Sequence, residues 1–110
     1  MNLPAVPFTF TDWSQVEAVE HRGETGTSYW WVYEQGGLRV RVVEYSPGYR
    51  ADHWCGRGHV LFMLEGELSI ELRDGRRITM TPATSFQAGD DEDNPHLAFT
   101  EKGAKVLIVD

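Results

Sequence analysis

From residue 27 to residue 110 the sequence alternates between short β-strand segments and turns, and this pattern constrains the fold more than any other feature. The segment "TSYWWVY" (27–33) is rich in β-branched and aromatic residues, and Asp74-Gly75 is a strong hairpin signal. The predicted strands are 27–33, 38–45, 59–64, 67–73, 76–80, 85–88, 96–100 and 104–109, and only Asp12–Val19 has the pattern of a short helical turn. This succession predicts an all-β fold of antiparallel strands, in a sandwich or a barrel.

Length and composition indicate one domain and exclude several partners. The chain has 110 residues, a size typical of a single core. Its formal net charge of −7 disfavours nucleic acids and anionic membranes. No apolar run reaches the roughly 20 residues that span a bilayer, and the first residues do not resemble a signal peptide. A single cysteine fits a reducing compartment, so we expect a cytoplasmic protein whose partner is a small molecule, a metal or another protein.

Chemistry-bearing side chains gather in "ADHWCGRGH" (51–59). His53 and Cys55 project to one face of an extended segment, because side chains alternate along a strand. His59 follows a two-glycine turn and begins a strand that can pair back alongside, and His96 begins another strand after the acidic loop. Imidazole and thiolate are natural ligands of zinc and of later first-row metals. The competing interpretation is structural, with a buried thiol and hydrogen-bonded imidazoles.

These residues resemble the motifs of the cupins. The first cupin motif is matched in outline by Gly48, His53, Cys55, His59 and Gly66, with Cys55 at the position of the second histidine and His59 at that of the glutamate. His96 matches the metal-binding histidine of the second motif. More narrowly, the order Asp52, His53, Trp54, Cys55 and the ending "GAKVLIVD" are similar to the small cupins named for a DHCW motif.

The resemblance covers about Thr27 to Asp110 and implies a cupin-type double-stranded β-helix, a jelly-roll barrel with a metal at its open mouth. It implies one cupin domain over 1–110, in which 1–26 packs on a barrel formed by 27–110. The sequence departs from the family pattern where the usual glutamate ligand and the Pro-x-Gly before the last histidine would stand. The implied ligands are His53, Cys55, His59 and His96, holding one divalent transition metal per chain (Zn, Fe, Ni or Mn).

Coordination number separates the functions that such a set allows. Four protein ligands around tetrahedral zinc make a closed structural site, whereas six-coordinate iron, nickel or manganese keeps positions open. With Cys55 unbound, three histidines also leave an open site. The sequence therefore predicts a metal-dependent oxygenase, isomerase or lyase acting on a small molecule. The alternatives are a non-catalytic cupin that binds a ligand or senses a metal or redox state through Cys55, and a domain with a closed structural metal site. No catalytic residue is assigned.

Four further features of the sequence predict where their side chains lie. His21 in "EHRGETG" is expected in a surface turn, and the acidic residues 90–93 in a solvated loop that raises the pKa of His96. Arg39 and Arg41 are expected to be solvated, unless one faces the cavity and holds an anionic ligand. Trp54 is expected to point outward, where it favours a subunit interface and hence a homodimer.

Overall fold

The computed structural model describes residue 3 and residues 5–110, which form nine β-strands and one short 3-10 helix. Their bounds are η1 Trp13–Gln15, β1 Val19–Arg22, β2 Thr27–Gln35, β3 Leu38–Tyr45, β4 His59–Gly66, β5 Leu68–Leu72, β6 Arg77–Met80, β7 Ser85–Ala88, β8 His96–Phe99 and β9 Ala104–Val109. The strand segments predicted from residue 27 onward are confirmed to within a few residues at each end. No helix in the described part of the chain is long and apolar enough to cross a membrane.

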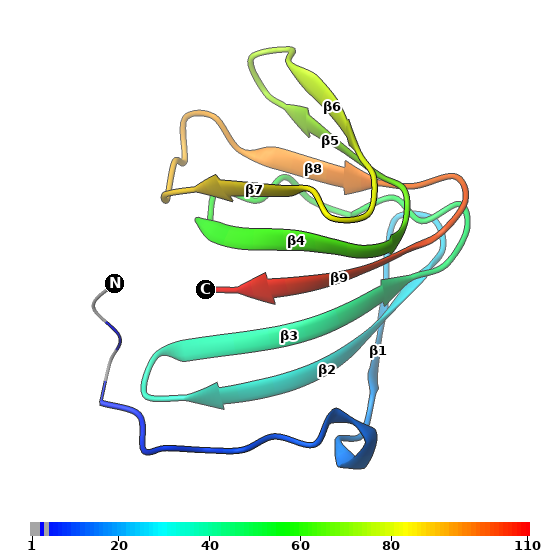
Figure 1. The fold of residues 1–110 in the computed structure, drawn as a ribbon. Helices are drawn as coiled ribbons and strands as arrows, with labels where there is room; N and C mark the ends of the chain where they lie inside the picture. The colour runs from blue at the N-terminus through cyan, green and yellow to red at the C-terminus, as the bar shows by residue number, and fades with distance from the viewer. Residues whose placement is uncertain (1–2, 4) are drawn as a thin grey trace.

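The strands form two sheets whose pairings are all antiparallel. The larger sheet has the order β1-β2-β3-β9-β4-β7 and the smaller one the order β6-β5-β8. Figure 1 shows the smaller sheet lying over the part of the larger one that contains β4 and β7. The all-β antiparallel prediction is confirmed, and the arrangement is that of a jelly roll.

One apolar core lies between the two sheets. Strands of both sheets alternate, so that every second side chain points inward. Val106 on β9, Met63 on β4 and Leu68 on β5 are fully buried and belong to a single cluster that joins both sheets. This core fills the space between the two sheets, which leaves the ends of the fold for a candidate site.

The turn from β4 to β5 depends on a glycine. Gly66 has a φ of +80°, in the left-handed region that side chains rarely adopt. A Cβ atom at this position would collide with the carbonyl oxygen of Gly103, just before β9. The backbone of the β4–β5 turn can therefore approach β9 only because residue 66 has no side chain.

The N-terminal part differs from the sequence expectations at two points. The predicted helical turn within Asp12–Val19 is present as η1, but the surface turn expected at His21 is wrong. His21 lies in β1, which pairs with β2 and joins the larger sheet, and its ring stacks on Trp30 with the ring centroids 3.9 Å apart. The segment was misread because "VEHR" (19–22) carries no period-two apolar pattern.

Candidate metal and ligand site

His59 and His96 meet at one end of the fold, although they lie in different sheets. His59 is the first residue of β4 in the larger sheet, and His96 is the first residue of β8 in the smaller sheet. Their ring centroids are 4.9 Å apart, and the ring planes are nearly perpendicular at 86°. The start of β4 and the start of β8 therefore supply two imidazoles to one place.

The loop before His96 is held against the turn before His59. The backbone N–H of Gly58 donates to the Asp90 carboxylate at 2.6 Å, and the N–H of Asp91 donates to the carbonyl of Gly56 at 2.8 Å. A Cβ atom at Gly58 would collide with the backbone of Gly89, so the close contact requires glycine there. The acidic loop is thus partly a structural element that brings the two strand starts together.

Both imidazoles are neutral at neutral pH. The side chain of His59 is 7% exposed, and its burial, followed by the neighbouring His96, lowers its pKa to about 4. Burial also lowers the pKa of His96. The prediction that the acidic loop raises the pKa of His96 is wrong, because loss of hydration outweighs the field of carboxylates that the loop uses largely for its own hydrogen bonds.

Beside His59 lies a buried carboxylate that is surrounded by arginines. The Asp110 side chain is 2% exposed and accepts two hydrogen bonds from Arg39 at 3.0 Å each and one from Arg41 at 3.3 Å. The Nε atom of Arg57 lies 3.3 Å from Asp110 Oδ2. Burial favours the neutral acid, but the hydrogen bonds and charges of these arginines outweigh it and hold the pKa of Asp110 below its usual value.

This arginine cluster changes the interpretation of "LRVRVVEY" (38–45). Arg41 is buried at 5% exposure on the inner side of the sheet, so the expectation of a solvated edge residue is wrong for it. It lies close to the Trp30 ring, 4.5 Å from the centroid, and its Nε has no hydrogen-bond partner within the described residues. Asp110 occupies the position in front of the guanidinium that the sequence had suggested for an anionic ligand.

His59 has a donor atom without a partner. Its Nδ1 atom is buried, lies 3.6 Å from Asp110 Oδ2, and makes no hydrogen bond to any described residue. A buried polar nitrogen without a partner costs free energy and is uncommon in folded proteins. In their neutral forms, the rings of His59 and His96 each keep one nitrogen without a proton, the form in which histidine binds a metal.

The other two predicted ligands lie apart from this pair. The His53 side chain is 74% exposed, and its Nδ1 atom is 2.6 Å from the Asp52 carboxylate. Cys55 pairs with His96 through two backbone hydrogen bonds of 2.8 and 2.9 Å, yet its Sγ lies 4.0 Å from the carbonyl oxygen of Arg57. Among the described residues, no three His, Cys, Asp or Glu side chains are grouped so that they could hold a metal ion. Ligation by the set of four remains a prediction.

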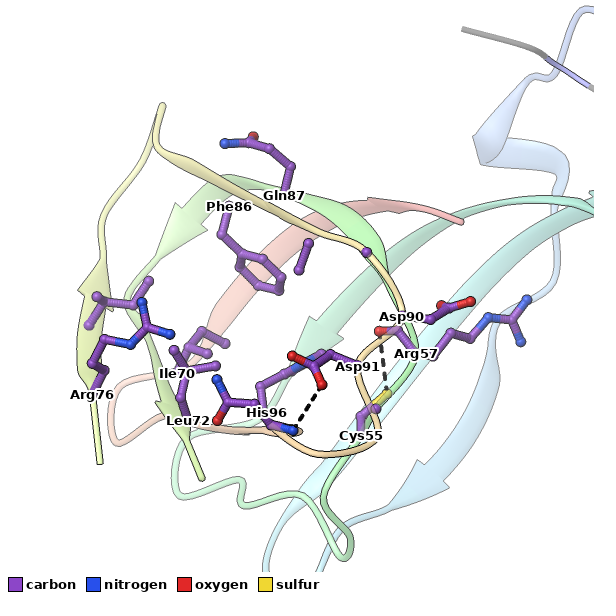
Figure 2. A pocket seen from close by; sticks show the side chains of 15 residues that line it. Cys55, Arg57, Ile70, Leu72, Arg76, Phe86, Gln87, Asp90, Asp91 and His96 are labelled. Atoms are coloured by element: carbon purple, nitrogen blue, oxygen red, sulfur yellow. Dashed lines mark hydrogen bonds between the residues drawn. The ribbon is translucent and has the colours of Figure 1, made fainter. Parts of the chain in front are cut away.

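A cavity of about 470 Å³ opens beside His96, between the two sheets. Its inner wall is apolar and includes Ile70, Leu72 and Phe86, whereas Cys55 and Arg57 lie at its rim (Figure 2). The Phe86 ring packs against both imidazoles, with centroids 5.6 Å from His59 and 5.4 Å from His96. No sequence pattern singles out Phe86, because an aromatic residue in a short strand is most often a core residue.

Trp54 does not form a bare outward surface. It is half-buried, and the guanidinium of Arg73 lies 4.5 Å from the centroid of its ring. The residue therefore gives no support to a subunit interface at this position, and the homodimer remains a prediction that needs another surface.

Comparison with solved structures identifies the fold. A predicted oxalate decarboxylase from Thermotoga maritima is similar with a TM-score of 0.76 and 12% identity, over 92% of this chain and 96% of that one. An RmlC-like cupin from Shewanella frigidimarina has a TM-score of 0.71 and 18% identity, over 96% and 90%. HppE in its Fe(II) form, in complex with substrate, has a TM-score of 0.72 and 14% identity, over 94% of this chain and 60% of that chain.

No family model matches the sequence, and a search of curated proteins finds no match. The structural likeness nevertheless shows that this chain has the cupin fold, as the sequence motifs implied. Proteins of this fold in the comparison include metal-dependent enzymes, and the chain spans 60% of the length of HppE. The narrower resemblance to the DHCW-motif cupins remains a prediction.

Proposed function

We propose that this chain binds one divalent transition metal through His59 and His96 and a small molecule in the adjacent cavity. The observation that carries the proposal is the pair of neutral imidazoles, 4.9 Å apart between their centroids, with an unpartnered buried nitrogen on His59. The Fe(II) form of HppE gives a precedent for a metal on this fold.

The imidazole nitrogens of His59 and His96 suit a metal that takes only some of its ligands from the protein. Imidazole binds zinc, iron and nickel, and both rings have pKa values low enough to be unprotonated at pH 7. Cys55 pairs with His96 across an antiparallel bridge and lines the same cavity, which makes it a candidate third ligand. A metal bound by two or three protein ligands would supply a Lewis acid with open positions, which favours the open site over the closed structural zinc.

The remaining residues define what can bind beside the pair. Phe86, Ile70 and Leu72 keep water from one side of the cavity and offer an apolar contact. Arg57, whose guanidinium pairs with Asp110, and the carboxylates of Asp90 and Asp91 also line the cavity. A volume of about 470 Å³ lies in the range of roughly 300–1,000 Å³ that small-molecule sites occupy. These features support a small ligand with a polar end near His96 and an apolar body.

The metal can be tested on untagged protein by elemental analysis, followed by titration of metal-free protein with zinc or iron. We expect about one metal per chain in the wild type, and a loss of at least tenfold in affinity for His59→Ala and for His96→Ala. His21→Ala is the matched control, since His21 lies in β1 and its ring stacks on Trp30 of β2. His53→Ala decides whether the predicted fourth ligand takes part. Folded wild-type protein that refuses added metal would contradict the proposal.

A second function is favoured by the position of the only cysteine. Cys55 lines the cavity and is partly exposed, so a small oxidant can reach its thiol. In a sensing cupin, oxidation of this thiol would change metal or ligand affinity without any turnover. A Cys55→Ser variant that keeps metal affinity unchanged before and after peroxide treatment, while the wild type loses it, supports the sensor. Equal behaviour of both proteins argues against it.

A further inference from the structure

Asp110 stands between Arg39 and His59 in one row that crosses three strands. β9 lies between β3 and β4 in the larger sheet (Figure 1). The register of β9 with both neighbours, continued one residue past its end, sets Asp110 beside Arg39 on one side and beside His59 on the other. Two backbone hydrogen bonds of 2.7 and 2.9 Å join Asp110 to Arg39, and the Arg39 guanidinium donates to both carboxylate oxygens at 3.0 Å. Asp110 is therefore a firmly held neighbour of the His59 ring.

The Nδ1 atom of His59 faces an acceptor and no donor. Asp110 Oδ2 lies 3.6 Å away, and no described residue makes a hydrogen bond to this buried nitrogen. The guanidiniums nearby lie against the carboxylate instead, 3.0 to 3.3 Å from its oxygens, and belong to Arg39, Arg41 and Arg57. A neutral imidazole carries one proton, on Nδ1 or on Nε2. A lone pair on Nδ1 would point at a negative oxygen, so the proton belongs on Nδ1.

We propose that Asp110 is a positioning residue that holds the Nδ1 proton of His59 and so leaves Nε2 of this ring as the metal-binding atom. The inference rests on the metal site proposed above. A histidine that binds a metal almost always donates its other ring N–H to a carboxylate, a backbone carbonyl or water, which fixes the tautomer and the orientation of the ring. The present separation of 3.6 Å is longer than a hydrogen bond, and a ring movement of roughly 0.5 Å brings it into the usual range.

The arginines give this carboxylate the properties that the role needs. The Asp110 side chain is 2% exposed, so water does not compete strongly for its oxygens. The guanidiniums keep it charged and fixed in direction, whereas an exposed carboxylate would be solvated and mobile. A carboxylate that accepts the Nδ1 proton also makes Nε2 more basic and strengthens its bond to a metal. The buried cluster thus prepares His59 for a metal as well as stabilising this end of the fold.

The tautomer of His59 can be measured in metal-free protein, without any activity. In protein labelled with ¹⁵N in its histidine rings, two-bond proton–nitrogen spectra at about pH 7.5 show which ring nitrogen carries the proton. The signals of His59 are those lost in His59→Gln. We expect the proton on Nδ1 of His59 in the wild type, and a proton on Nε2 overturns the proposal.

Two variants test whether Asp110 sets this tautomer. Asp110→Asn is combined with Arg41→Met, which removes the guanidinium that would otherwise be left buried and unpaired. The amide has no negative charge and can donate to Nδ1, so the double variant should change from the Nδ1-protonated to the Nε2-protonated form, while Arg41→Met alone should not. Asp52→Asn is the matched control, since it removes a carboxylate 2.6 Å from Nδ1 of His53 and should leave the His59 signals unchanged. A double variant that keeps the tautomer of Arg41→Met overturns the proposal.

Zinc titration then connects the tautomer with the metal site. Asp110→Asn/Arg41→Met should bind zinc about 10- to 100-fold more weakly than Arg41→Met does. Equal zinc affinity in these two proteins overturns the role of Asp110 in metal binding. A protein that shows the expected tautomers but refuses zinc contradicts the metal site and still supports the contact between Asp110 and His59. If the double variant does not fold, the wild-type tautomer decides alone.

Discussion

Asp110→Asn is the substitution whose effect follows most directly from the geometry beside His59. The carboxylate is 2% exposed and is the counter-charge for Arg39, Arg41 and Arg57. The amide keeps the shape but removes the negative charge, which leaves Arg41, with its side chain 6% exposed, without an ionic partner. Removing one partner of a buried ion pair costs about 3–5 kcal/mol, and the half-exposed Arg57 adds little.

Urea denaturation, followed by tryptophan fluorescence, measures this loss. With a slope of roughly 1–1.5 kcal/mol/M for a chain of this size, the midpoint should fall by about 2–5 M. Glu24→Gln is the control, because it removes an exposed carboxylate 3.6 Å from Arg50 and should leave the midpoint nearly unchanged. Adding Arg41→Met to Asp110→Asn should recover part of the loss, since it removes the unpaired buried charge. If Asp110→Asn shifts the midpoint no more than Glu24→Gln does, the buried cluster does not hold this end of the fold together.

Two further predictions concern the imidazole pair and a turn. In metal-free protein, His59 has a pKa of about 4 when folded and near 6.5 when unfolded, so protons favour the unfolded chain between these values. The free energy of unfolding should therefore be constant above pH 7 and fall by on the order of 3 kcal/mol as the pH drops to 4. His59→Gln should flatten this dependence on pH. An unchanged slope in that variant would exclude His59 as the source of the dependence. Gly66→Ala should lower the free energy of unfolding by at least about 2 kcal/mol, because it adds a collision with Gly103 to an unfavourable φ. Gly37→Ala also has an unfavourable positive φ but open space around the new side chain, so it should lower the free energy of unfolding by only about 1 kcal/mol. Equal losses in the two alanine variants, measured by thermal unfolding, would contradict the close approach.

The sequence predicted the strands because their signals are local. Alternation in "ELSIELR" (67–73) and the Asp74-Gly75 turn act over a few residues, and the structure has β5, the turn and β6 there. The sequence predicted a set of four ligands, His53, Cys55, His59 and His96, and of these the structure brings the rings of His59 and His96 together. Strand β1 was missed because its apolar residues do not alternate and its four residues are all exposed.

The environment of the site could not be read from the sequence, because it depends on long-range packing. Alternation placed Arg39 and Arg41 on one face of their strand but could not say that this face is the inner one. Asp110 follows 71 residues after Arg39, and no local pattern indicates that their side chains meet. The pKa of His96 was predicted in the wrong direction because the sequence shows nearby carboxylates but not the burial that outweighs them.

We propose that two neutral imidazoles from separate sheets hold a metal at the mouth of this cupin fold. A crystal structure of metal-loaded protein, with anomalous diffraction at the zinc, iron, nickel and manganese edges, tests it directly. We predict one anomalous peak per chain, bonded to a nitrogen of His59 and a nitrogen of His96. A peak at His53 with none between these two rings, or metal-free crystals grown from metal-saturated solution, would contradict the claim.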